Sequence, residues 1–291
     1  MNIAIFGGSF DPPHKAHLAI AKNALATLNI DLLIITPAFL NPFKTSVFAS
    51  AKLRLKWCQM LFGKLEKIKI SDYEIAQNRP VASIQSVRYF KNLYKPDKIY
   101  LIIGADNLAN LTKWHDYNHL CELCEFVVAL RDDIIINPQY KTLKINEKIS
   151  STFIRNQKDF SKIPPLLREE IKKFYTKRLK MQDRINKIIK ILEDKKAEDA
   201  QAIDMSGRDY IAKFVIIATT LHAKHAASLI DELATRLKPL GEQFLGSECS
   251  DEWSVIDLGD IIIHLMSQNY RAKYNIEEFL DKLKKIPKLK F

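Results

Sequence analysis

The sequence predicts an α/β protein of two domains, the first built on a doubly wound parallel sheet. The chain has 291 residues, 47% of them hydrophobic, so it is too long for one ordinary core and too apolar for a disordered chain. Apolar runs of strand length alternate with amphipathic stretches from the first residues onward. Strands that are apolar on both faces indicate a sheet covered by helices on both sides, with ligands beyond the carboxyl ends of its strands.

The first half of the chain predicts five strands and five helical segments. The expected strands span residues 3–6, 32–36, 68–71, 99–103 and 126–130. The expected helices span residues 18–28, 51–61, about 83–93 and 164–179, with a short helical piece near Leu108. Since strands and helices alternate, crossover connections and a parallel sheet are expected.

The second half predicts a smaller α/β domain with a mixed sheet. A basic amphipathic helix begins near Met181, without a Gly/Ser-rich linker before it. Beyond it we expect strands at residues 202–205, 214–218, 254–258 and 260–266, and helices at 222–237 and 276–283. The predicted domains are therefore residues 1–180 and 181–291.

Charge is distributed unevenly between these halves. Residues 1–180 contain 28 Lys and Arg against 16 Asp and Glu, whereas residues 181–291 contain 17 against 18. A basic first half favours phosphate-bearing ligands, although lysine-rich surfaces are also a common compositional habit. The absence of a long apolar run or a leader-like amino terminus predicts a cytoplasmic protein with no membrane partner, and four scattered cysteines argue against a disulfide framework.

A glycine-containing turn joins the first strand to the first helix and reads GGSFDPPHKAH over residues 7–17. Its glycines let backbone N–H groups approach a phosphate, and the helix that follows offers its positive amino-terminal end. His14 and His17 lie on one helix face, so both imidazoles can point at the same phosphate chain. Gly-Gly alone usually makes a turn and such a His pair alone is usually surface decoration. Together, directly after a buried strand, they indicate nucleotide chemistry.

This turn resembles the GGSFDPxHxGH signature of bacterial nicotinate-nucleotide adenylyltransferases, which are nucleotidyltransferases with an H-x-G-H motif on a Rossmann-like fold. The segment ISSTFIR at residues 149–155 looks like the second signature of that family, ISSTxIR. The resemblance implies an in-line attack by a mononucleotide phosphate on the α-phosphorus of ATP, with release of pyrophosphate and no covalent enzyme intermediate. It also implies a magnesium ion that bridges oxygens of ATP.

The same resemblance assigns roles to single residues. His14, His17, Lys44 and Arg155 are the predicted catalytic residues. The histidines contact the reacting phosphates, Lys44 reaches the phosphates from the loop after the second strand, and Arg155 holds the triphosphate together with Ser151 and Thr152. The predicted ATP-binding residues are Gly7, Gly8, Ser9, Phe10, Ala16, Ser151 and Thr152. Ala16 stands where the family has glycine between the histidines, so we expect a shifted or weakened ATP pose without loss of function.

The acceptor nucleotide is predicted to bind elsewhere on the same domain. Residues 103–114, IGADNLANLTKW, resemble the family's IGxDxxxxLxxW, whose aspartate meets a ribose and whose tryptophan stacks on the pyridine ring. The predicted mononucleotide-binding residues are Ser83, Gly104, Asp106 and Trp114. At residues 82–83 the family's Tyr-Thr, whose backbone grips the pyridine substituent, reads Ala-Ser. We favour nicotinate mononucleotide as acceptor, with nicotinamide mononucleotide as the alternative.

The second half resembles the ribosomal silencing factor family, also called Iojap-like, over nearly all of residues 182–285. The most specific stretch is WSVIDLGDIIIH at residues 253–264, and further matches are Asp209-Tyr210, residues 215–219, Arg271 and Tyr274. The resemblance implies binding to the large ribosomal subunit at its inter-subunit face, through a ribosomal protein, which restrains subunit joining and translation. Trp253 is the candidate ribosome-binding residue. The alternative is a second domain that only oligomerises or regulates the first.

Three further clusters could be interpreted as metal sites, and for each we favour a structural role. They are His115, His119, Cys121 and Cys124; His222, His225 and His264; and the pair Asp257 and Asp260, which could hold magnesium as in polymerase-like nucleotidyltransferases. We therefore predict no protein-built metal site and no DNA partner. A homo-oligomer is compatible with the sequence.

Overall fold

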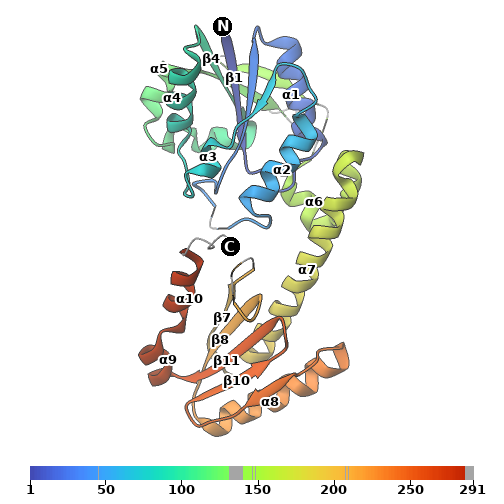
Figure 1. Cartoon of the computed structure of the whole chain (residues 1–291), viewed down its shortest axis with the longest axis vertical. Helices are drawn as coiled ribbons and strands as arrows, with labels where there is room; N and C mark the ends of the chain where they lie inside the picture. The colour runs from blue at the N-terminus through green and yellow to red at the C-terminus, as the bar shows by residue number, and fades with distance from the viewer. Residues whose placement is uncertain are drawn as a thin grey trace, which may run out of the picture. The chain divides into compact units, whose positions relative to one another are not determined.

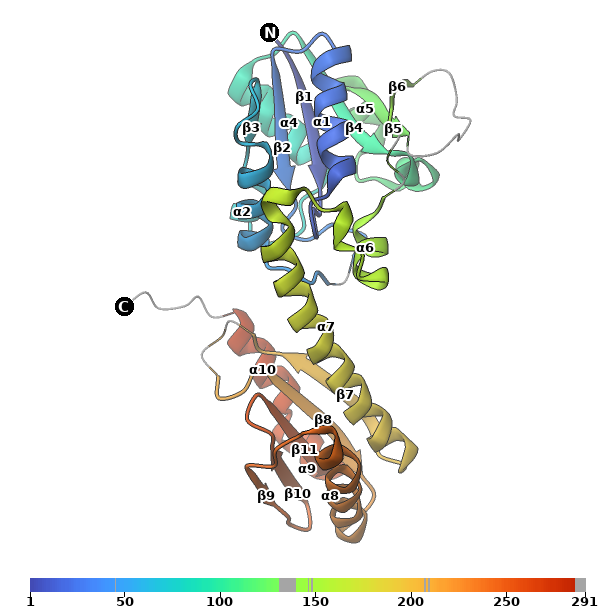
Figure 2. The ribbon, with the colours of Figure 1, turned by 90° about the vertical axis from the view of Figure 1, so that its right-hand side faces the viewer.

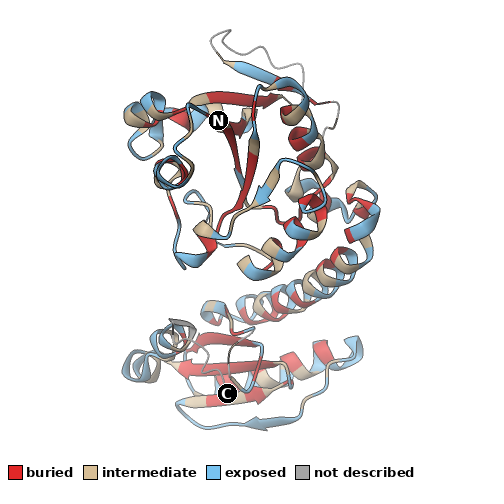
Figure 3. Ribbon diagram, turned by 45° about the horizontal axis from the view of Figure 1, so that its top comes forward, coloured by how far each residue is buried: buried red, intermediate tan, exposed pale blue. Residues whose placement is uncertain are grey.

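The computed structural model describes residues 1–44, 46–130, 140–145, 147, 149–206, 208 and 210–285. The chain divides into two compact units, Met1–Arg178 and Leu179–Phe291 (Figure 1). Each unit has its own sheet, and the central strands of both sheets are buried along most of their length (Figure 3). Among the described helices, none combines the length and the apolar character needed to cross a membrane.

The sheet of the first unit has six parallel strands in the order β3-β2-β1-β4-β5-β6. They are β1 (Asn2–Gly8), β2 (Leu32–Pro37), β3 (Ile68–Ile70), β4 (Lys98–Gly104), β5 (Glu125–Leu130) and β6 (Lys141–Lys144). The direction of winding reverses between β1 and β4, and in open α/β sheets ligands bind at that point beyond the carboxyl ends. The predicted Rossmann-like parallel sheet is confirmed.

Helices cover both faces of this sheet, with α1 on one face and α4 on the other (Figure 2). The helical segments are α1 (Lys15–Thr27), α2 (Ala51–Phe62), α3 (Tyr73–Ala76), α4 (Ser83–Tyr94), η1 (Ala105–Lys113), α5 (Tyr117–Leu123), α6 (Ser151–Gln157) and η2 (Phe160–Lys162). Ile3 and Ile5 of β1 pack with Val87 and Phe90 of α4 in one buried cluster. Both faces of the central strands are therefore dry, as their apolar sequences predict.

A single helix, α7 (Pro165–Asp194), stands where the sequence analysis predicts two helices separated near residue 180. That prediction is wrong, because residues 166–194 contain no glycine or proline and consist mostly of good helix formers. The change of charge near Met181 marks no break in the backbone. Tyr175 of α7 is buried in the first unit, whereas Ile185 and Ile188 lie in the core of the second.

The second unit has a five-stranded mixed sheet in the order β7-β8-β11-β10-β9. Only the β8–β11 pair is parallel among these strands, so the predicted mixed sheet is confirmed. Its elements are β7 (Glu198–Asp204), β8 (Phe214–Thr220), α8 (Ala223–Leu237), η3 (Lys238–Leu240), β9 (Gly246–Glu248), β10 (Trp253–Asp257), β11 (Ile261–Ser267), α9 (Gln268–Tyr274) and α10 (Ile276–Lys285). One face of the sheet packs with α7 and α8, and the other packs with α10.

Candidate functional site

The carboxyl ends of the central strands bring three distant loops of the first unit together. Gly8 at the end of β1 is paired with Pro37 at the end of β2, and β4 runs parallel on the other side of β1. The loops after β2 and β4 carry Lys44 and Asp106. Lys44 is exposed as a whole, yet partial burial of its ammonium and the charge of Arg155 lower its pKa, while Asp106 acts to raise it. Lys44, Asp106 and Arg155 are therefore electrostatic neighbours, although they are far apart in the chain.

His14 and His17 form one stacked pair at the start of α1. The backbone N–H of His14 donates to Nδ1 of His17 at 3.2 Å, and the two ring centroids lie 3.8 Å apart. His14 is 1% exposed and His17 is 9% exposed, so the interpretation of the pair as surface decoration does not hold. Because Nδ1 of His17 accepts a hydrogen bond, the proton of a neutral His17 lies on Nε2.

Phe10 anchors the turn that precedes this pair. Its ring is buried and lies 4.8 Å from the ring of His17, and its backbone is in the left-handed region with φ of +48°. A Cβ added at Gly8 would lie only 3.2 Å from the Phe10 ring, whereas one at Gly7 would make ordinary contact with Thr36. We conclude that Gly8 leaves room for the Phe10 ring, which in turn packs on His17.

The two sequence signatures, some 140 residues apart, are joined by hydrogen bonds. Ser151 at the start of α6 donates from Oγ to the carbonyl of Pro12 at 2.9 Å. The guanidinium of Arg155 donates to the carbonyl of Asp11 and, at 3.1 Å, to Oγ1 of Thr152. These contacts place the start of α6 beside the turn that leads into α1. Two of the predicted ATP-binding segments thus form one surface.

Asp11 has a structural role that its place in the signature does not reveal. Its buried carboxylate accepts hydrogen bonds from the backbone N–H groups of Phe48 at 2.8 Å and Ala49 at 3.0 Å, and from the hydroxyl of Tyr175. Burial, together with the nearby Asp11 charge, raises the pKa of Tyr175, so its hydroxyl stays a donor. Arg54 was also missed. Its signal was a charged side chain on the apolar stripe of α2, where Trp57, Cys58 and Leu61 are buried.

The residues predicted to bind the acceptor lie around β4 and α4. Gly104 ends β4, Asp106 is exposed on η1, and half-buried Trp114 follows η1. Ser83 is the first residue of α4, where helical backbone N–H groups have no partner within the helix. Ala82 and Trp114 pack against the same buried cluster of β1, β4 and α4. Both predicted acceptor segments therefore rest on one rigid core.

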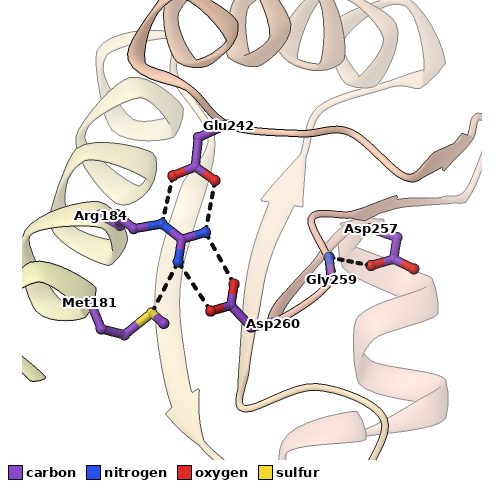
Figure 4. Close-up of polar contacts among 6 residues, drawn as sticks. All are labelled: Met181, Arg184, Glu242, Asp257, Gly259 and Asp260. Carbon is purple, nitrogen blue, oxygen red and sulfur yellow. Dashed lines mark hydrogen bonds and ion pairs between the residues drawn. The ribbon is translucent and has the colours of Figure 1, made fainter. Parts of the chain in front are cut away.

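In the second unit, Arg184 of α7 forms ion pairs with two carboxylates (Figure 4). It donates to Glu242 at 2.6 and 2.7 Å and to Asp260 at 3.1 Å through two nitrogens. Asp257 instead accepts from the backbone N–H of Gly259 at 2.7 Å, and Gly259 has φ of +82°. Asp257 thus closes the turn between β10 and β11, and Asp260 is neutralised by a fixed cation. These contacts favour the structural role of the two aspartates over a magnesium pair.

Trp253 begins β10 and lies in an aromatic group on one face of this sheet. Its indole Nε1 donates to Nδ1 of His264 at 3.0 Å, and its ring centroid lies 5.5 Å from that of Tyr274, which is 47% exposed. Burial lowers the pKa of His264 to about 4, so this acceptor stays neutral near pH 7. Of the other predicted residues, Tyr210 packs on the same core, while Asp209 lies outside the described residues.

Both units resemble known protein families. Residues 5–157 match the cytidylyltransferase-like family, and residues 178–290 match the family described as ribosomal silencing factor during starvation. A probable nicotinate-nucleotide adenylyltransferase of Campylobacter fetus is 57% identical over 175 residues, which are 60% of this chain and 97% of that protein. A Campylobacter jejuni protein of the same description is 50% identical over 177 residues, 61% of this chain and 98% of that protein.

The first unit belongs to the nicotinate-nucleotide adenylyltransferase family. The second is similar to the ribosomal silencing factor family. A Plasmodium falciparum nicotinic acid mononucleotide adenylyltransferase complexed with NaAD has the same fold as the adenylyltransferase unit, with a TM-score of 0.52 and 23% identity over 60% of this chain and 97% of that one. The two sequence resemblances are thereby confirmed.

The described part of the adenylyltransferase unit offers few ligands for a protein-bound metal. In the described ranges, no three His, Cys, Asp or Glu side chains are placed to hold a metal ion. The carboxylate of Asp11 is already engaged by N–H and O–H donors, and Asp106 is an exposed carboxylate at the strand ends. Magnesium usually keeps several waters and binds substrate phosphates. The donor set therefore fits a magnesium ion that enters on ATP.

In the other two clusters considered as metal sites, the side chains contact different partners instead of one another. Cys124 is buried and donates to the carbonyl of Leu120 at 3.3 Å, whereas Cys121 is exposed. His225 pairs with the carbonyl of Lys195 at 2.7 Å, and His264 pairs with Trp253. These side chains serve local packing and hydrogen bonding.

Ala16 is fully buried on α1, so its methyl group packs inside the protein. Alanine also favours the helix by about 1 kcal/mol relative to the glycine of the family motif. The weakened ATP pose expected from this substitution stays a prediction.

Glu74 is a buried carboxyl near the start of the predicted acceptor segment, and no pattern in the sequence marks it. Its Oε1 accepts a hydrogen bond from Ser86 of α4 at 2.7 Å, which ties α3 to α4. Burial raises the pKa of Glu74 to about 7, because the charged form is poorly solvated there. Since Ser83 begins the same helix, Glu74 supports the position of the predicted pyridine-binding amides.

We expect Glu74→Gln to change how stability depends on pH. Between pH of about 4.5 and 7 the unfolded chain loses this proton while the folded chain keeps it, so the wild-type free energy of unfolding falls as pH rises through that window. The variant lacks this loss and should gain about 2–3 kcal/mol relative to wild type across the window. Urea unfolding at a series of pH values measures the difference. The exposed Glu66→Gln variant is the control, and a pH-independent difference for Glu74→Gln would contradict the prediction.

Proposed function

We propose that the adenylyltransferase unit transfers the adenylyl group of ATP to nicotinate mononucleotide, which yields deamido-NAD and pyrophosphate in NAD biosynthesis. The single observation that carries this is the junction of the two signatures, where Ser151 and Arg155 bond to the turn that holds the histidine pair. The junction lies in the same unit as the end of β1, where α/β folds bind nucleotides. The 57% identity to a Campylobacter fetus relative supports the same reaction.

In this reaction an oxygen of the mononucleotide phosphate forms a bond to the α-phosphorus of ATP. The bond from that phosphorus to the bridging oxygen breaks, and its electron pair leaves with pyrophosphate. The protein needs only to position the two phosphates and stabilise charge in the transition state. We assign this to His14, His17, Lys44 and Arg155, of which Lys44 and Arg155 are cationic neighbours. A magnesium ion bound to ATP would neutralise further phosphate charge.

The first test removes one of the stacked imidazoles. His17→Ala should lower the rate of adenylyl transfer by about 10²–10³, because one charge-stabilising group at the reacting phosphates is lost. Pyrophosphate release by the purified chain measures the rate. His119→Ala is the matched control. This histidine belongs to α5, where it lies beside Asp116 and Arg88 and away from the turn. Near-normal turnover in His17→Ala would refute the assignment.

The second test compares the two acceptor nucleotides side by side. We expect a higher kcat/KM with nicotinate mononucleotide than with nicotinamide mononucleotide, because the backbone N–H groups and the helix dipole at the start of α4 favour a carboxylate over a neutral amide. Initial rates with each acceptor at fixed ATP measure the preference. Equal or better use of the amide would leave adenylyl transfer in place and overturn the choice of acceptor.

For the silencing-factor unit we propose binding to the large ribosomal subunit, through a ribosomal protein at its inter-subunit face, with Trp253 as a contact. Such binding would block subunit joining and repress translation. The match of residues 178–290 to the silencing-factor family supports the proposal. So does the half-buried Trp253, whose indole is held by His264 beside exposed Tyr274, because a fixed, partly exposed aromatic side chain is typical of interface hot spots.

Trp253→Ala should weaken co-sedimentation of the full chain with large subunits by about tenfold or more, as loss of a hot-spot aromatic does. Phe279→Ala is the control, because this aromatic is also exposed in the second unit but lies on α10. Wild-type sedimentation by Trp253→Ala would remove Trp253 from the interface. Failure of the wild-type chain to sediment would instead favour a unit that only oligomerises or regulates the enzyme.

A further inference from the structure

Arg54 is a fully buried cation beneath the predicted phosphate-binding loops. It lies on the inner face of α2 in line with Trp57 and Cys58, which are also fully buried. Burial lowers its pKa, and the charge of Asp11 acts in the opposite direction. Burying a charge is costly unless hydrogen bonds compensate for the lost water. A guanidinium at this position therefore needs hydrogen-bond acceptors inside the protein.

The partners of Arg54 are backbone carbonyls of three separate segments. Nη1 donates to Ser9 at 2.6 Å, in the turn after β1, and to Ala38 at 2.7 Å, directly after β2. Nη2 donates to Phe39 at 2.7 Å, and Nε donates to Ala49 at 3.0 Å, just before α2. The planar fork of arginine presents several donors in fixed directions, which the ammonium of lysine cannot reproduce.

This arrangement fixes both ends of the segment that carries Lys44. Ala38 and Phe39 hold its beginning to Arg54, and Ala49 holds its end. Ser9 contributes twice, because its carbonyl accepts from Arg54 while its Oγ lies 3.3 Å from Nζ of Lys44. The hydrogen bonds of one guanidinium therefore restrain the distance between the Lys44 ammonium and the turn after β1.

We propose that Arg54 is a positioning residue for adenylyl transfer, which holds the Lys44 segment against the phosphate-binding turn. The inference rests on the proposed role of Lys44 at the phosphates of ATP. Arg54 itself is buried away from solvent, so it acts through Ser9 and the Lys44 segment and touches no substrate. Its loss should therefore impair the use of ATP more than the binding of the acceptor.

The test uses Arg54→Lys in the full chain, because this variant keeps the positive charge in the buried site. We expect kcat/KM for ATP to fall about 10- to 100-fold, because a misplacement of about 1 Å in a catalytic group has effects of that size. The KM for the mononucleotide should stay close to wild type. Cys58→Ala is the matched control, since it removes a buried side chain one turn further along α2 and should leave kcat/KM for ATP unchanged.

A double-mutant cycle with Lys44→Ala separates positioning from general stability. If Arg54 acts through Lys44, Arg54→Lys should have little further effect on kcat/KM for ATP once Lys44 is absent. Additive losses, or an ATP defect matched by Cys58→Ala, would overturn the inference. If Lys44→Ala alone retains full activity while the wild type transfers adenylyl groups, the premise and the inference both fail. A wild type without transfer activity would refute the proposed function itself.

Discussion

The buried carboxylate of Asp11 is the contact on which the geometry of the first unit depends. The carboxylate oxygens accept hydrogen bonds from Phe48, Ala49 and Tyr175. The backbone carbonyl of the same residue accepts one from Arg155. Four parts of the unit therefore meet at a single residue. They are the turn after β1, the segment that precedes α2, helix α6 and helix α7. Buried polar groups are expensive to leave unpaired, at about 1–3 kcal/mol each, so these segments are constrained together.

Arg54 complements Asp11 from the other side of the same loops. The guanidinium binds carbonyl oxygens of the segments whose N–H groups, at Phe48 and Ala49, bind the carboxylate. The two charges thus satisfy both donors and acceptors of irregular backbone that no strand or helix could satisfy. In the second unit Arg184 instead binds two side-chain carboxylates, those of Glu242 and Asp260, beside the β10–β11 turn. In both units the charged side chains hold loops in place.

The histidine pair that we propose to be catalytic depends on this support. His14 and His17 stack on each other, and Phe10 packs on His17 from the buried side. Their orientation is therefore set before any nucleotide arrives, which lowers the cost of assembling a transition-state site. Trp253 in the second unit is similarly held by His264, whose lowered pKa keeps it a neutral acceptor. Preorganisation is common to the proposed enzyme site and to the proposed partner surface.

The sequence alone determined the parallel sheet, the mixed second sheet and the resemblance of each unit to a family, because strand patterns and signature loops are local features. It did not predict the edge strands β6 and β9, because their short polar sequences have no apolar run. It also did not predict the continuity of α7, because a change in charge was interpreted as a boundary within an unbroken run of helix formers. The tertiary structure alone decided the roles of Asp11, Arg54, Glu74 and Asp260. Each of these side chains is defined by a partner 12 to 164 residues away, and no local pattern in the chain specifies such a contact.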